Sequence, residues 1–234
     1  FTGCVDSQKL HMAYGLSDGF RYKIIVTFSD LKAREIFEDY QFYDREVTWY
    51  PAKDLIFYQA DIHGNQLVTE RMKALRKIIE GKPQTVITTF AALMSPQVPL
   101  EEIAASVIHI DADSSLNEGE LARKLAEMGY EKNYQVDAPG QFSIRGGIID
   151  IFDLTEENPY RIELWGEEVE SIRSFDLLSQ RSVEKLNEVD IYPATEMMLS
   201  EEQKEKGLRR IEKEAKEFEE KLRSSFLTEE AHRV

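Results

Sequence analysis

The sequence predicts an α/β protein in which a smaller α+β antiparallel domain is inserted into a parallel-sheet domain. The first 100 residues alternate short apolar runs with helical patterns, which is typical of parallel strands joined by helices. Beyond residue 100, apolar and polar residues alternate along short arms, the pattern of an antiparallel sheet with one solvated face. Pro96 and Pro99 lie where the pattern changes. We therefore expect one domain over residues 1–100 and 189–234 and a second domain over residues 101–188.

Strands and helices of the first domain follow from the spacing of its apolar residues. After an opening turn and helix, Lys23–Phe28 is an apolar run suited to a buried parallel strand. Ser29 or Asp30 can then cap a second helix, because short polar side chains accept hydrogen bonds from the free amides of a first turn. An amphipathic helix is predicted over residues 66–80, and Thr85–Thr89 is the next buried strand.

The second domain is organised around a hairpin over residues 140–152. Polar and apolar residues alternate on both sides of a glycine pair, so each arm has one apolar face. Tyr160–Trp165 repeats the alternation as a third arm, residues 169–175 return as a fourth, and Gly119–Met128 is predicted as the helix of this domain. Arg145 adjoins the glycine pair, where a turn can hold its planar guanidinium toward a carboxylate of a partner. The alternative is a solvated turn arginine.

The carboxyl end of the chain is predicted to be a charged, amphipathic helix. Its apolar stripe consists of Leu208, Ile211, Ala215, Phe218, Leu222 and Phe226. We expect this stripe to pack on the first domain rather than to form a coiled coil, because the run is short.

Composition limits the classes of function. The formal charge of −15 argues against a surface built mainly to neutralise phosphates. The single cysteine, Cys4, allows no internal disulfide and fits a reducing compartment. No apolar run approaches the roughly 20 residues needed to span a bilayer, and no signal peptide opens the chain. We expect a cytoplasmic protein without a membrane partner, and a fragment of a longer protein, because the chain opens inside a motif and ends on a charged helix.

Groups that could carry catalysis or bind a metal are scattered along the chain. The histidines, at no metal-ligand spacing, are His11, His63, His109 and His232. A turn at the end of a strand explains Asp111 and Asp113 as well as a metal pair does. No nucleophile occurs with a matching base. We predict no catalytic residue, no metal and no other cofactor.

Four segments carry a likeness to a known family, and this likeness runs from Thr2 to about Glu196: they are Arg145–Gly147, Tyr160–Leu164, Ser171–Asp176 and Ser179–Ser182. Together they resemble the amino-terminal, UvrB-like region of the bacterial transcription-repair coupling factors (Mfd). This region of the family is itself similar to the excision-repair protein UvrB. The resemblance implies a degenerate P-loop-type sheet domain and a smaller domain that binds the damage-recognition protein UvrA. It also implies that RNA polymerase and DNA are partners of the intact protein, an ATP-dependent DNA translocase, through parts that this chain does not contain.

Three residues fall at positions that the family associates with UvrA contact. Lys132 and Arg145 occupy basic positions, and Phe152 lies on the same hairpin as Arg145. Arginines of UvrB are replaced here by Lys132 and Ser143, so the detailed contacts are expected to differ, since a lysine cannot reproduce a bidentate fork. A core role for Phe152 is the equal alternative, because buried phenylalanine is common.

The loop that would bind a nucleotide lacks required groups. Read by spacing from Gly3, Lys9 is in place, but Gln8 replaces the second glycine and Leu10 replaces the Ser or Thr that would hold magnesium. Aligned instead on its Thr-Gly pair with UvrB, the chain has Asp6 at the lysine position, where it would repel phosphate. Either reading predicts a degenerate nucleotide loop.

The resulting prediction is a non-catalytic protein-binding module that recruits UvrA in transcription-coupled nucleotide excision repair. One alternative is a fragment of UvrB or another helicase that hydrolyses ATP, which would need the glycine, lysine and hydroxyl together. The other is direct DNA binding by an aromatic loop near Tyr58, although such aromatics more often cover the edge of a core.

Overall fold

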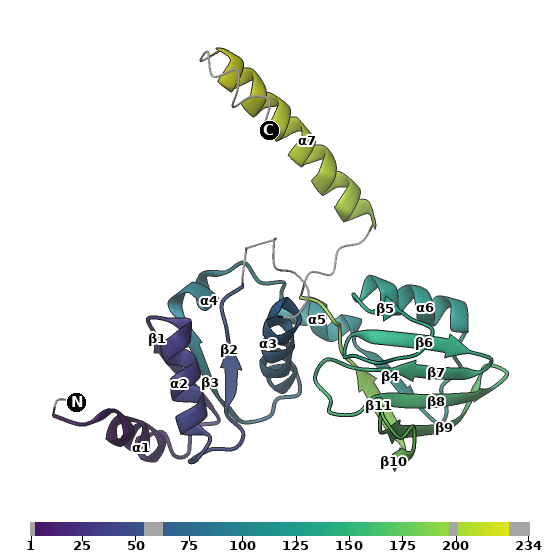
Figure 1. The fold of residues 1–234 in the computed structure, drawn as a ribbon, viewed down its shortest axis with the longest axis horizontal. Coiled ribbons are helices and arrows are strands. Elements are labelled where there is room, and N and C mark those ends of the chain that lie inside the picture. The colour runs from purple at the N-terminus through teal and green to yellow at the C-terminus, as the bar shows by residue number, and fades with distance from the viewer. Residues whose placement is uncertain (1–2, 54–62, 197–200, 225–234) are drawn as a thin grey trace. The chain divides into compact units, whose positions relative to one another are not determined.

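The computed structural model describes residues 3–53, 63–196 and 201–224 and confirms a mixed α/β fold with several sheets (Figure 1). Contacts group residues 1–196 into one compact unit and residues 197–234 into another. The helices are α1 (Asp6–Leu16), α2 (Asp30–Tyr40), α3 (His63–Ile79), α4 (Phe90–Met94), α5 (Leu100–Ser106), α6 (Glu118–Glu127) and α7 (Glu201–Ser224). The strands are β1 (Tyr22–Thr27), β2 (Thr48–Tyr50), β3 (Gln84–Thr89), β4 (Ile108–Asp111), β5 (Glu131–Lys132), β6 (Gln141–Arg145), β7 (Ile148–Ile151), β8 (Tyr160–Trp165), β9 (Glu168–Phe175), β10 (Ser182–Leu186) and β11 (Glu188–Ile191).

The first sheet contains three parallel strands in the order β1-β3-β2. Its core includes Ala33 and Tyr40 of α2 together with Trp49 and Ile87 of the strands. Ser29, rather than Asp30, caps α2, because the Ser29 hydroxyl accepts a hydrogen bond from the amide of the first turn at 3.3 Å. The sheet therefore has the strand direction that the first 100 residues predict.

The expectation that the first strand is buried is wrong. In β1, Ile24 is 63% exposed and Val26 is 37% exposed. The reason is strand order, since among the residues that the structure describes β1 lies at the edge of the sheet and pairs with β3 alone. Of the two predicted buried strands, only β3 occupies the central position and is buried along most of its length.

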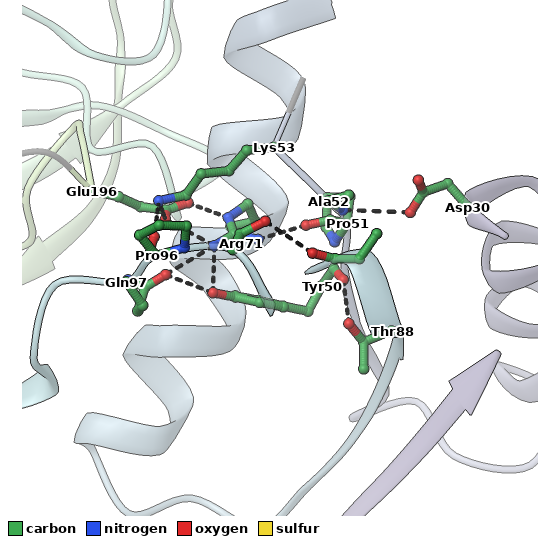
Figure 2. Close-up of polar contacts among 12 residues, drawn as sticks. Asp30, Tyr50, Pro51, Ala52, Lys53, Arg71, Thr88, Pro96, Gln97 and Glu196 are labelled. Atoms are coloured by element: carbon green, nitrogen blue, oxygen red, sulfur yellow. Dashed lines mark hydrogen bonds and ion pairs between the residues drawn. The ribbon is translucent and has the colours of Figure 1, made fainter. Parts of the chain in front are cut away.

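An ion-pair cluster around the buried side chains of Arg71 and Glu196 joins α3 to three separate segments of the same unit (Figure 2). This Arg71 cluster consists of Tyr50, Lys53, Arg71, Gln97 and Glu196. Arg71 donates a hydrogen bond from Nη2 to Glu196 Oε2 at 2.9 Å and another to Gln97 Oε1 at 2.8 Å, and its Cζ lies 3.9 Å from the centroid of the Tyr50 ring. Lys53 Nζ lies 3.1 Å from Glu196 Oε2. The cluster fixes the segment that follows the antiparallel strands, at Glu196, to a helix of the parallel part.

The second sheet has six strands in the order β10-β9-β8-β7-β6-β5, antiparallel except for the β5–β6 pair. The four predicted arms are β6 to β9, which confirms the alternation read from the sequence. The predicted helix, α6, packs its Leu121 and Leu125 with Phe142, Ile149 and Ile162 of the strands. One face of the sheet is therefore the core, and side chains that alternate with these strand residues belong to the opposite face.

A separate two-stranded ladder pairs β4 with β11 in antiparallel register. In the chain, β4 precedes the six-stranded sheet and β11 follows it. The segment that enters this sheet and the segment that leaves it therefore run side by side. His109 of β4 faces Asp190 of β11, with 2.7 Å between Nδ1 and Oδ1. This agrees with the return of the chain predicted near Asp190, while the domain bounds themselves stay a prediction.

The charged helix predicted at the carboxyl end is α7. Leu208, Ile211 and Phe218 of its apolar stripe are 61%, 63% and 52% exposed. That this stripe packs on the first domain stays a prediction. Among the residues that the structure describes, no helix is both long enough and apolar enough to cross a bilayer.

Candidate protein-interaction site

The β6–β7 hairpin holds Arg145 at the end of β6, opposite Ile148. Gly146 and Gly147 form its turn at φ values of +57° and +82°, a region that side chains disfavour. A Cβ atom on Gly147 would lie only 3.1 Å from the Leu164 carbonyl oxygen. Gly147 is therefore required by the geometry of the turn, and the turn fixes the place of Arg145.

The Arg145 side chain lies between a buried carboxylate and an exposed aromatic ring. Its Nη2 donates a hydrogen bond to Asp150 Oδ2 at 3.1 Å, and its Cζ lies 5.5 Å from the centroid of the Tyr134 ring. The Arg145 side chain is 36% exposed, whereas that of Asp150 is 2% exposed. One edge of the guanidinium is thus anchored to the sheet while the side chain still reaches solvent.

Asp150 is shared by two arginines. Arg161 donates to it from Nε at 2.6 Å and from Nη2 at 2.9 Å, a charge-assisted, two-point contact. This hydrogen bonding raises the pKa of Arg161. Arg161 is further held over the Phe175 ring at 4.1 Å and donates to Gln180 Oε1 at 3.0 Å. The buried negative charge of Asp150 is therefore paired with the guanidinium groups of Arg145 and Arg161, as a buried charge requires.

The other two predicted contact residues have different surroundings. Lys132 is exposed on the edge strand β5, in register with Phe142 of β6. Phe152 is only 4% exposed, so its ring lies in the core and not at the surface. Tyr134, whose ring lies beside the Arg145 guanidinium, is 83% exposed. Tyr134 is an isolated aromatic outside any repeating pattern, so it was not predicted as a contact residue. The signal that could have indicated it is an aromatic residue two positions after Lys132.

The degenerate nucleotide loop lies at the start of α1. Gly3 has a φ of +81°, and the helix begins at Asp6. The Gln8 side chain accepts a hydrogen bond from the N-cap amide at 3.3 Å, and Leu10 is 8% exposed within the core of the three-stranded sheet. Lys9 belongs to the same helix. Gln8, which replaces the second glycine, therefore caps the helix, and Leu10, which replaces the Ser or Thr, packs in the core.

Within the described ranges, no group of three or more His, Cys, Asp or Glu side chains is arranged to hold a metal ion. Asp111 instead accepts hydrogen bonds from the Asp113 amide at 3.1 Å and the Ser114 hydroxyl at 2.7 Å, as in a turn at the end of a strand. Tyr58 and its aromatic neighbours fall in residues 54–62, outside the part of the chain that the structure describes.

Comparison with known families defines the class of this protein. Residues 108–197 match the UvrB interaction domain. The matched range extends from β4 past β11 and contains Lys132, Arg145 and Phe152. The chain thus carries an interaction module, which is a binding domain and not a catalytic one.

Comparison with individual proteins identifies the family more closely. The chain is 39% identical to the transcription-repair-coupling factor of Bacillus subtilis over 169 residues, which are 72% of this chain and 14% of that protein. It is 33% identical to the factor of Staphylococcus aureus over 204 residues, 86% of this chain and 17% of that protein. It is 35% identical to the factor of Myxococcus xanthus over 153 residues, 65% of this chain and 13% of that protein. The chain belongs to the UvrB-like region of this family, as the resemblance implied, and spans less than a fifth of the length of these relatives.

Proposed function

We propose that this chain is a protein-binding module that recruits UvrA for transcription-coupled nucleotide excision repair, and that its antiparallel sheet supplies the contact surface. The observation that carries the proposal is the placement of Arg145, a partly exposed cation held by Asp150 on a chain of net charge −15. A fixed cation on an acidic protein orients a partner that carries complementary negative charge. The match of residues 108–197 to an interaction domain supports the same assignment.

We propose further that the parallel part is a degenerate P-loop-type domain without ATP hydrolysis of its own. Its three-stranded parallel sheet with flanking helices is compatible with such a domain. Gln8 caps the helix and Leu10 packs in the core, so the side chains that replace the nucleotide-binding groups have structural roles, which supports the proposal. ATP-driven movement on DNA and contact with RNA polymerase would then belong to parts of the intact protein outside this chain.

Charge reversal at Arg145 tests the binding function. The affinity of purified UvrA for the parent chain is compared with its affinity for Arg145→Glu, after circular dichroism has shown that the variant folds. Arg34→Glu is the matched control, because Arg34 is 58% exposed on α2 and the change in charge is the same. We expect Arg145→Glu to weaken binding at least about tenfold, the effect of removing a hot spot, and the control to bind like the parent. Binding of Arg145→Glu with parent affinity contradicts the proposed surface, and no binding by the parent contradicts the function.

A further inference from the structure

We infer that Tyr134 is the aromatic anchor of the UvrA-binding surface, and that Asp150 is the positioning residue that holds Arg145 beside this ring. The inference rests on the proposed function and adds Tyr134 and Asp150 to the residues that the sequence predicts for this surface. The aromatic contact predicted from the sequence was Phe152, which is buried. We infer that the exposed ring of Tyr134 fills this role at the surface instead.

The Tyr134 ring has the surroundings of an interface anchor. It is 83% exposed and lies beside the Arg145 guanidinium, with 5.5 Å between Cζ and the ring centroid. Tyrosine and arginine are enriched among residues that dominate binding energy, because both combine large contact area with polar groups. Lys132 precedes the tyrosine by two residues and adds a second exposed cation. An exposed ring in contact with one cation, on a segment that carries a second exposed cation, suits a partner surface with carboxylates next to an apolar side chain.

The backbone around Tyr134 is held on both sides. On one side, the Asn133 amide donates to the carbonyl of Phe142 at 2.9 Å. On the other side, the Gln141 side chain accepts hydrogen bonds from two successive amides, beginning with Asp137 at 3.0 Å. Little backbone freedom would be lost when a partner covers this ring, and a preorganised surface binds more tightly than a mobile one.

Asp150 controls the direction of the Arg145 side chain. Among the described residues, the hydrogen bond that Arg145 makes runs from Nη2 to Asp150, so its other N–H groups remain for a carboxylate of the partner. Arg161 fixes Asp150 in turn through its two-point contact. A neutral amide at position 150 would keep the shape of the side chain but weaken its attraction for both arginines.

Variants at Tyr134 test the anchor. We expect Tyr134→Ala to weaken UvrA binding at least about tenfold, while Tyr134→Phe keeps the ring and stays within about threefold of the parent. Phe42→Ala is the control for loss of an exposed ring, because Phe42 is 89% exposed and precedes β2 in the parallel part, far along the chain from the hairpin. Parent-like binding by Tyr134→Ala overturns the anchor even if Arg145→Glu has lost binding. No binding by the parent itself overturns the proposed function instead.

A double-mutant cycle tests the role of Asp150. Asp150→Asn is expected to weaken binding about fivefold in the parent, and to have no further effect when Arg145 is already alanine. A merely structural role would lower binding by the same factor in both backgrounds, and that result overturns the positioning role. Unfolding midpoints of all variants are measured alongside, so that loss of the folded state is not read as loss of contact. Because Tyr134 is at the surface, its variants remain informative even if Asp150→Asn is unstable.

Discussion

Replacing Arg71 by methionine is expected to lower the free energy of unfolding by about 3 kcal/mol. The side chains of Arg71 and Glu196 are 1% and 5% exposed, so the change leaves a buried carboxylate without its main partner. Breaking such a pair from one side costs about 3 to 5 kcal/mol. The lower end applies because Lys53 Nζ still lies 3.1 Å from Glu196 Oε2 and is 26% exposed. For a chain of this size the loss corresponds to a melting temperature lower by about 6 to 12 °C.

Chemical unfolding followed by circular dichroism measures this loss, with the slope of the transition checked for each variant. Removing both charges, as in Arg71→Met with Glu196→Gln, should restore part of the stability, because no uncompensated charge stays buried. Arg34→Met is the control, since Arg34 and its partner Glu38 are 58% and 64% exposed and such pairs contribute less than about 1 kcal/mol. The reasoning is refuted if Arg71→Met is as stable as the parent, or if the double variant loses the sum of the two single losses.

Three further predictions concern the turn, the β4–β11 ladder and the nucleotide loop. Gly147→Ala should destabilise the fold by about 1 to 3 kcal/mol in urea unfolding, because its φ is +82° and a Cβ would approach a carbonyl at 3.1 Å, whereas Gly146→Asn should cost less. The hydrogen bond that the His109 ring donates to the Asp190 carboxylate raises the pKa of His109 above 6.5, so Asp190→Asn should lower the midpoint of an NMR titration. The stabilising effect of this pair should be complete below about pH 6.5 and disappear as pH rises through the raised pKa. Adding ATP with magnesium should leave the melting temperature of the parent chain unchanged. The Leu10→Thr variant should melt at a lower temperature than the parent, because Leu10 is in the core, and ATP with magnesium should not shift its melting temperature either.

The sequence predicts best those elements whose pattern is local. The four arms from β6 to β9 follow from alternation between polar and apolar residues, and the glycine pair marks their first turn. Edge strands are harder to predict: β5 has two exposed, charged residues, Glu131 and Lys132, with no apolar face. The exposure of Ile24 could not be predicted either, since it depends on the order of strands in the sheet and not on the composition of one strand.

In the candidate site, too, some features follow from the local sequence and others depend on how the strands pair and pack. The neighbourhood of Arg145 and the glycine pair is local, and the sequence places it correctly at a hairpin turn. The sharing of Asp150 between Arg145 and Arg161 depends on cross-strand register, which brings together residues from three strands. The burial of Phe152 and the exposure of Tyr134 depend on how the hairpin packs, so the sequence alone left the first open and did not indicate the second.

Titration of purified UvrA into the parent chain, followed by calorimetry, tests the central claim most directly. The account predicts saturable binding that persists with Arg34→Glu and weakens at least about tenfold with Arg145→Glu. Failure of the folded parent chain to bind UvrA at any concentration tested would contradict it.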